Sequence, residues 1–309
     1  MNLTDRPAPA SAVAREALLL LITLAVGALV VTAIVFLPVW FGRSFDPSLE
    51  SFQRYLAAMG NYLGGLQQGR LGVNPRGRPV NDELLQATRR TLELLVTSMA
   101  AALALGLAWG AALATIRRGR TAALLLGLST VVISLPSFTM MLLLAEAVAT
   151  ITLRTGVRLA YVQGYGLDGH LILPTAVLAV RGGAYIARAV QVAQEEIMGQ
   201  EYIRAARAKG LGGFDLWRRH VLPALRLPLL GATLGAVRVI VAGMVIVDFM
   251  YGWGGLGRKL LSVNSEGVVA AGNAEVAAGA AVILLLIFVL IDAVGRLLIR
   301  GAVPQSGAE

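Results

Sequence analysis

The sequence of 309 residues is poor in cysteine, in aromatic residues and in charge. It contains no cysteine, which excludes a disulfide framework, a thiolate metal site and a cysteine nucleophile. Aromatic residues make up 6% and charged residues 15% of the chain, whereas 57% of the residues are hydrophobic. This balance, with a mean hydropathy of +0.72, excludes a water-soluble domain of ordinary composition and indicates a protein with several membrane spans.

Motifs for hydrolysis and for metal binding are also lacking. No GxxxxGK[ST] segment occurs, so a transporter with this sequence takes its energy from a partner or from an ion gradient. His170 and His220 are far apart and offer neither a metal triad nor a catalytic dyad. Residues 252–257 satisfy GxGxxG, but no βαβ pattern surrounds them, so dinucleotide binding is not expected. We therefore expect no catalytic residue, no metal and no cofactor in this chain.

Six apolar segments are long enough to cross a bilayer, which requires about 20 residues. The first is longer than the apolar core of a secretory signal, roughly 7 to 15 residues, so we expect it to stay in the membrane. Pro136 interrupts the third, where we expect a kinked span because proline removes a backbone hydrogen bond. The sequence thus predicts an all-α integral membrane protein with spans at about 17–40, 92–116, 121–151, 171–192, 227–249 and 276–299.

The distribution of positive charge favours an orientation with both termini in the cytoplasm. The net charge is +9, and most basic residues flank apolar spans, so the positive-inside rule explains them better than nucleic-acid binding. The inner segments hold 14 Lys and Arg and the outer ones 11, of which seven lie in one long loop that counts less in this rule. We divide the chain into a cytoplasmic tail (1–15), a transmembrane domain (16–300) with an outer loop (39–90) and a cytoplasmic loop (194–226), and a second cytoplasmic tail (301–309).

The cytoplasmic loop between the fourth and fifth spans is the most informative segment. It holds six of the 27 Lys and Arg residues between positions 204 and 226. Residues 202–209 are good or acceptable helix formers, Gly210 suits a left-handed helix end, and Pro223 suits the start of the next helix. From these residues alone, the segment is either an ordinary basic loop or a helical hairpin that docks into a groove of another protein.

The spacing in this loop resembles the EAA loop of ABC-transporter permease subunits. Arg204-Ala205-Ala206 is followed after three residues by Gly210, and Leu222-Pro223 lies twelve and thirteen residues beyond that glycine. Tyr202-Ile203-Arg204 and the following residues are similar to the version in dipeptide, oligopeptide and nickel permeases, with Arg204 where the general pattern has glutamate. The resemblance implies that the loop couples to a cytoplasmic ATPase through Arg204, Ala205, Ala206, Arg207, Lys209, Gly210, Leu222 and Pro223.

Similarity to the same family extends over most of the chain. The outer loop resembles the external loop of the peptide permeases, with Tyr62-Leu63-Gly64-Gly65-Leu66 before Gly77-Arg78-Pro79-Val80. Ser134–Phe138 resembles a SIPSF kink in the third span. Residues 251–257 resemble a PGLG turn after the fifth helix, although Tyr251-Gly252-Trp253-Gly254-Gly255 replaces a simple Tyr-Pro-Gly. This difference leaves the shape of the outer turn open.

Ionisable residues within or at the ends of the spans are the candidate substrate contacts. A charge at the bilayer centre costs about 2.5 to 3.5 kcal/mol on insertion scales, so it normally faces protein or water. In one interpretation, Arg181 and Arg238 line a translocation pathway and meet a substrate carboxylate, while Glu146 or Asp248 meets its amine. In the other, these residues pair with one another or with a second permease subunit and fix helix packing.

The resemblance implies a type I importer fold and a permease subunit of a binding-protein-dependent ABC importer for peptides or similar small solutes. It also implies the partners: a homologous second permease subunit, two cytoplasmic ATPase subunits that bind ATP and Mg, an external solute-binding protein and the lipid bilayer of a bacterial or archaeal plasma membrane. Dipeptides, oligopeptides, glutathione-like molecules and nickel complexes all remain open as substrates. The alternatives are a secondary transporter or channel driven by an ion gradient, with Glu146 and Asp292 as ion sites, and a structural membrane scaffold.

Overall fold

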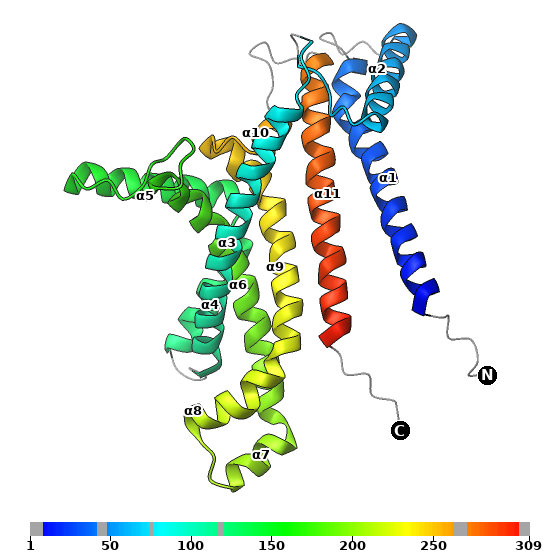
Figure 1. Ribbon diagram of the computed structural model, residues 1–309. Coiled ribbons are helices and arrows are strands. Elements are labelled where there is room, and N and C mark those ends of the chain that lie inside the picture. Colours follow the sequence, from blue (N-terminus) through cyan, green and yellow to red (C-terminus); the bar gives the residue numbers. More distant parts are fainter. Residues whose placement is uncertain (1–8, 42–47, 75–76, 116–119, 262–270, 303–309) are drawn as a thin grey trace. The chain divides into compact units, whose positions relative to one another are not determined.

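The computed structural model describes residues 9–41, 48–74, 77–115, 120–261 and 271–302 (Figure 1). Within these ranges the chain is helical apart from its connections and an isolated antiparallel bridge between Val73 and Pro79. Several predicted features lie wholly or partly outside the described residues: the tails at 1–15 and 301–309 and parts of the outer loop at 39–90.

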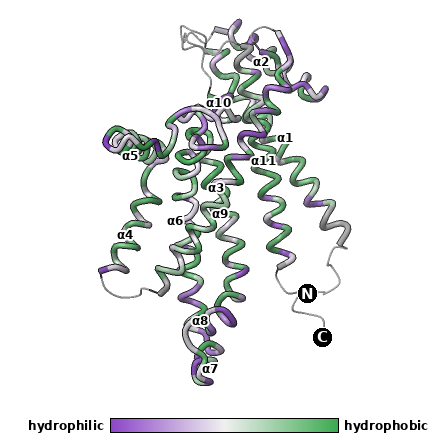
Figure 2. The backbone as a smooth tube through the Cα atoms, turned by 60° about the vertical axis from the view of Figure 1, so that its left-hand side comes forward, coloured by the Kyte–Doolittle hydropathy of each residue, from purple (hydrophilic) through white to green (hydrophobic). Residues whose placement is uncertain are grey.

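Six helices of the described chain are long and apolar enough to cross a membrane, which confirms the predicted number. Helices α6 (Gly169–Gly199) and α9 (Leu222–Tyr251) extend beyond the predicted fourth and fifth spans at both ends. Figure 2 shows hydrophobic residues along the long helices and hydrophilic residues gathered at α7 and α8. The six candidate spans are Ala14–Phe41, Asn81–Leu113, Ser137–Thr155, Gly169–Gly199, Gly213–Tyr251 and Ala274–Gly301.

The predicted third span is wrong as a single kinked helix. The structure instead has two helices, α4 (Arg120–Ser134) and α5 (Ser137–Thr155), which run in different directions in Figure 1. Pro136 between them has an extended backbone, with φ −60° and ψ 145°. Proline disfavours helical geometry in the residue before it and cannot donate a backbone hydrogen bond, so the helix stops instead of bending. Of the two, α5 alone reaches the length of a span.

The predicted outer loop contains more helix than its polar sequence indicated. Helix α2 (Leu49–Gln67) lies within this loop, and the Ser48 hydroxyl caps it by accepting the Ser51 N–H at 3.2 Å. Helix α3 (Asn81–Thr115) begins eleven residues before the predicted second span. Asp82 and Glu83 lie in its first turn, where carboxylates favour the positive end of the helix dipole.

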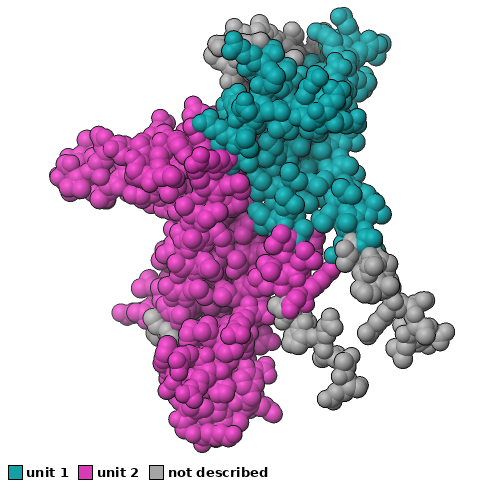
Figure 3. All heavy atoms as spheres, viewed as in Figure 1, with its two compact units in different colours: residues 1–88, 259–293 teal, residues 89–258, 294–309 magenta. Residues whose placement is uncertain are grey.

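The chain divides into two compact units (Figure 3). Unit 1 comprises residues 1–88 and 259–293 and includes α1 (Pro9–Phe41), α2 and most of α11 (Ala271–Ala302). Its core gathers Phe36, Tyr55 and Tyr62 with two alanines of α11. The Tyr55 hydroxyl donates to the Ala33 carbonyl at 3.2 Å, which ties α2 to α1.

Unit 2 comprises residues 89–258 and 294–309, and α6 and α9 form its centre. In the most apolar 18-residue stretch of α6, 56% of the residues are buried, whereas in the corresponding stretch of α1 the share is 6%. Helix α6 is therefore a core helix, and most of the surface of α1 is exposed. Glycines allow the helices to approach closely: a Cβ on Gly106 of α3 would lie 2.6 Å from the Ile186 Cβ, and one on Gly182 would lie 2.9 Å from Ile240.

Candidate functional site

A helical hairpin connects α6 to α9, as the sequence predicts (Figure 1). It consists of α7 (Glu201–Ala208), a turn, α8 (Gly213–Leu216) and one π-helical segment, η1 (Trp217–Val221). Gln200 separates α6 from α7 because its backbone is extended, with φ −69° and ψ 150°. The hairpin is therefore a distinct element at the joined ends of the two core helices.

Gly210 ends α7 in the left-handed conformation, with φ +82°, which confirms the predicted glycine stop. Around it, the Leu211 N–H donates to the Ala206 carbonyl at 3.1 Å, and the Gly210 N–H donates to the Arg207 carbonyl at 2.9 Å. These bonds satisfy carbonyls that a helix end leaves without partners. Any residue with a Cβ is strained at this φ by roughly 1 to 2 kcal/mol, although no neighbouring atom lies within 4 Å of the Cβ position.

The apolar face of the hairpin packs against the ends of α6 and α9. Ile203 and Val221 are fully buried, and they share a cluster with Ile197 of α6 and Leu225 of α9. Burial of one such aliphatic side chain contributes roughly 1.5 to 3 kcal/mol. The hairpin is thus packed onto the two helices that it connects, and a force applied to it acts on both.

The two alanines of the predicted coupling motif have different surroundings. Ala205 is exposed, whereas Ala206 is only 6% exposed and belongs to the buried cluster of the hairpin. Ala206 lies three residues from Ile203 on the face of α7 that packs inward, whereas Ala205 is on the face left open for a partner.

The opposite face of the hairpin is basic and exposed. We define the basic face as Arg204, Arg207, Lys209, Arg218 and Arg219, all of which are exposed. Phe214 beside this face belongs to no predicted site, although it is 72% exposed and stacks on Trp217 with ring centroids 6.2 Å apart. An aromatic residue in a polar loop is the signal that would have found it, because exposed aromatics are enriched at interfaces.

Leu222 and Pro223 begin α9, as predicted, and both are exposed. The π-helical turn before them was not predicted. Its wider hydrogen bonding joins the Leu222 N–H to the Trp217 carbonyl, five residues earlier. Pro223 fits the first turn of α9, where the missing N–H costs no helical hydrogen bond.

The predicted pathway residues lie on three helices of unit 2. Arg181 of α6 donates from Nη1 to the Ser137 hydroxyl at 2.7 Å, at the start of α5. This contact fits the packing interpretation for Arg181. Glu146 is exposed on α5 and accepts a hydrogen bond from Thr150 at 3.4 Å, and Arg238 is exposed on α9.

Asp248 organises the turn that follows α9. It is 1% exposed, and its carboxylate accepts the backbone N–H of Gly255 at 2.9 Å and that of Arg258 at 3.0 Å. The Thr91 hydroxyl of α3 accepts the Leu256 N–H at 2.8 Å. These contacts give the Asp248 carboxylate a structural task in place of the open position that a substrate amine would require.

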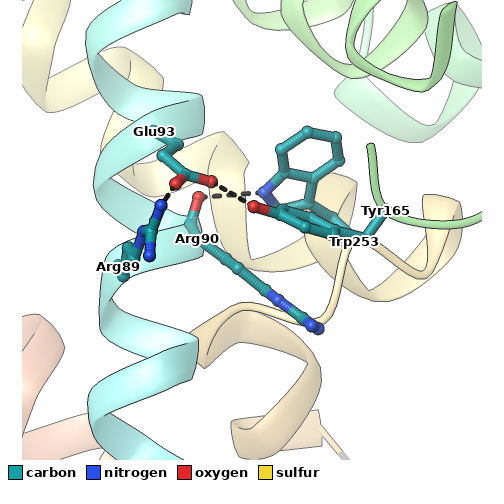
Figure 4. Close-up of polar contacts among 5 residues, drawn as sticks. All are labelled: Arg89, Arg90, Glu93, Tyr165 and Trp253. Carbon is teal, nitrogen blue, oxygen red and sulfur yellow. Dashed lines mark hydrogen bonds and ion pairs between the residues drawn. The ribbon is translucent and has the colours of Figure 1, made fainter. Parts of the chain in front are cut away.

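Five residues join this turn to α3 and to the α5–α6 loop (Figure 4). The fully buried indole of Trp253 donates from Nε1 to the Arg90 carbonyl at 2.9 Å. Tyr165 packs edge-on against Trp253, and its hydroxyl donates to the Glu93 carboxylate at 2.7 Å, which raises the pKa of Tyr165. The Arg90 guanidinium lies 4.2 Å from the centre of the Tyr165 ring, and Arg89 pairs with Glu93 at 3.0 Å. We define the anchor cluster as Arg89, Arg90, Glu93, Tyr165 and Trp253.

Comparison with known proteins gives the hairpin and the helices a context. The family of binding-protein-dependent transport system inner membrane components matches residues 104–303. The dipeptide transport system permease protein DppB of Escherichia coli (strain K12) is 32% identical over 241 residues, which cover 68% of this chain and 69% of that protein. The oligopeptide transport system permease protein OppB of Mycobacterium tuberculosis (strain H37Rv) is 31% identical over 252 residues, which cover 74% of this chain and 75% of that protein.

A third relative and a solved structure are also similar to this chain. The glutathione transport system permease protein GsiC of Escherichia coli O6:H1 is 30% identical over 207 residues, covering 65% of this chain and 64% of that protein. A chain of the inward-facing MetNI methionine ABC transporter has a TM-score of 0.57 at 23% identity, covering 71% of this chain and 96% of that one. This structural likeness shows a shared fold.

Proposed function

Because this chain belongs to the family of binding-protein-dependent transport system inner membrane components and is a permease subunit of an ABC importer, we propose that it forms half of a pathway for peptides. The relatives named above carry the names of dipeptide, oligopeptide and glutathione transporters, which share peptide chemistry. The family match disfavours the alternative of an ion-gradient-driven transporter and that of a structural scaffold.

The observation that carries the coupling proposal is the two-sided hairpin. Its apolar face is packed onto α6 and α9, and its basic face and Phe214 are exposed for a partner. We assign the partner as one of two cytoplasmic ATPase subunits, which bind ATP and Mg. An aromatic side chain that enters an apolar pocket, surrounded by charge, is the usual composition of a strong contact between proteins.

Alternating access follows from this attachment. When the ATPase subunits close on ATP, they displace the hairpin, and its buried cluster forces the ends of α6 and α9 to move with it. Helix α9 is about 45 Å long, and its other end carries the turn held by Asp248 and Trp253. Motion at the hairpin is thereby transmitted to the far end of the same unit.

The remaining partners follow from the importer class. A homologous second permease subunit completes the pathway, and an external solute-binding protein delivers the substrate. The hairpin and both termini face the cytoplasm. Arg238 and Glu146, which are exposed, are the proposed contacts for the substrate carboxylate and amine, whereas Arg181 and Asp248 hold α5 and the turn after α9 in place.

Reconstitution tests the proposed function. Vesicles that contain the permease pair and the ATPases should accumulate a labelled dipeptide only with ATP and the solute-binding protein. The variant Arg204→Gln/Arg207→Gln on the basic face should lose copurification of the ATPases. Arg120→Gln, an exposed residue outside the hairpin, is the matched control and should retain them. Uptake driven by an ion gradient without nucleotide would overturn the proposal.

A further inference from the structure

The loop between α5 and α6, residues 156–168, carries an exposed surface that the coupling mechanism does not use. It lies at the opposite end of α6 from the hairpin, about 46 Å along the helix. The inference drawn from it rests on the proposed function, because the loop faces outward if the hairpin faces the cytosol. Several of its apolar side chains are exposed: Val157, Leu159, Tyr161, Val162 and Leu167.

This loop has a fixed shape although it contains no helix or strand. The Tyr161 ring stacks on His170 with centroids 4.2 Å apart, and His170 Nδ1 lies 2.6 Å from the Asp168 carboxylate. The Gly164 N–H donates to the Tyr251 carbonyl at 2.9 Å, which fastens the loop to the end of α9. Tyr165 is held by the anchor cluster (Figure 4). A surface ordered in advance loses little conformational entropy when it binds a partner.

The same surface carries unbalanced positive charge. The Arg158 guanidinium lies 5.2 Å above the Tyr161 ring, Arg90 lies above Tyr165, and Arg258 donates to the Gly252 carbonyl at 3.3 Å. In the described part of the chain, no carboxylate lies within ion-pair distance of these three arginines. Of the carboxylates nearby, Glu93 pairs with Arg89, and Asp168 is hydrogen-bonded to His170, so the three arginines and Arg89 outnumber the two carboxylates.

We propose that this loop patch, defined as Arg90, Arg158, Tyr161, Val162, Tyr165 and Arg258, docks the external solute-binding protein through an acidic surface of that protein. Arginine and tyrosine around apolar side chains are the residues that contribute most at protein interfaces. The positive-inside rule favours arginine in cytoplasmic loops, so it does not explain these arginines on the outer side of the membrane. The excess charge selects an acidic partner, and of the proposed water-soluble partners the binding protein is the one on this side of the membrane.

The test is the affinity of the solute-binding protein of the same transporter for the assembled permease–ATPase complex. Arg158→Glu/Arg258→Glu should weaken binding at least about tenfold at low salt, with the loss mainly in the association rate, and the difference should shrink at high salt. Tyr161→Ala should weaken binding at both salt concentrations, whereas Tyr161→Phe should not. Copurification of the ATPases and ATP hydrolysis without binding protein should stay unchanged in all of these variants.

A second double variant locates the docking surface if it lies elsewhere. Arg54→Glu/Arg78→Glu changes the same charge on exposed residues of the 39–90 segment. If this variant loses binding while the loop-patch variants bind normally, docking belongs to that segment and the inference is overturned. If the loop-patch variants bind normally but lose partition into anionic vesicles, the patch contacts lipid headgroups, which also overturns it. In either case ATP-driven uptake by the unaltered complex leaves the proposed function standing.

Discussion

The indole Nε1 of Trp253 lies 2.9 Å from the backbone carbonyl oxygen of Arg90, to which it donates a hydrogen bond. The two residues are 163 positions apart in the sequence. Their contact joins the turn after α9 to α3, while Asp248 holds the same turn from within α9. Helix α9 therefore connects the hairpin at one end to a braced turn at the other, and several expected effects of substitution follow from this arrangement.

Replacement of Trp253 by Phe removes the donor and leaves the Arg90 carbonyl without its partner. We expect the complex to lose about 1 to 3 kcal/mol of unfolding free energy, because an unpaired buried polar group keeps its desolvation cost. Peptide uptake should fall further than ATP hydrolysis, since motion of α9 no longer reaches α3. Thermal unfolding and uptake measured on one preparation provide the check, and an unchanged uptake-to-hydrolysis ratio would contradict the bracing role.

Gly210 and Gly212 form a matched pair in the hairpin turn. Neither has an atom within 4 Å of its Cβ position, but Gly210 has φ +82° and Gly212 has φ −141°. Gly210→Ala should therefore cost roughly 1 to 2 kcal/mol and weaken ATPase binding, whereas Gly212→Ala should have a smaller effect. Copurification yield and chemical unfolding of the two variants decide the matter. Equal behaviour would show that the left-handed turn is not required.

Gly106 and Gly231 distinguish packing within the chain from contact with a second subunit. A Cβ on Gly106 would meet the Ile186 Cβ at 2.6 Å and the Gly183 carbonyl at 2.9 Å, so Gly106→Ala should cost about 1 to 3 kcal/mol. Gly231 has no atom within 4 Å, and Gly231→Ala should leave the isolated chain as stable as before or more stable. Loss of permease pairing in Gly231→Ala, seen by size-exclusion chromatography, would place a subunit seam at this position.

Tyr165 predicts a pH effect in the alkaline range. Its hydrogen bond to Glu93 raises the pKa of the hydroxyl above the usual 10.0. Because the pKa of Tyr165 is higher in the folded state, its hydrogen bond to Glu93 contributes fully to folding stability below pH 10. That contribution is lost as the pH rises through the pKa of the folded state. Glu93→Gln removes the carboxylate and should lower the pKa of Tyr165. The tyrosinate absorbance measures the titration of Tyr165 when the curve of Tyr165→Phe is subtracted. An identical pKa for Tyr165 in the unaltered protein and in Glu93→Gln would contradict the contact.

Local sequence signals predicted the hairpin well, whereas long-range contacts escaped them. Gly210 and Pro223 fix helix ends through their own backbone preferences, so a few neighbouring residues suffice. The number of spans follows from the length and composition of the apolar segments. The inward position of Ala206 depends on α6 and α9 packing against it, and the role of Asp248 depends on how the following turn folds back to donate its backbone N–H groups.

The break at Pro136 shows a different limit. Proline predicts a disturbance in a helix, but whether the chain kinks or separates into two helices depends on what surrounds the freed backbone groups. In this protein Arg181 contacts Ser137 directly after the proline and holds the start of α5 against α6. Such a contact between residues 44 positions apart cannot be predicted from the sequence around residue 136.

The position of Lys209 tests the central claim most directly, because the chain has no cysteine and Lys209→Cys introduces a single thiol on the exposed basic face. In intact cells, a membrane-impermeant maleimide should leave this thiol unlabelled, and in the assembled complex a short thiol-to-amine crosslinker should join it to an ATPase subunit. Labelling from outside the cell, or a crosslink-free hairpin in a complex that still transports, would contradict the coupling role.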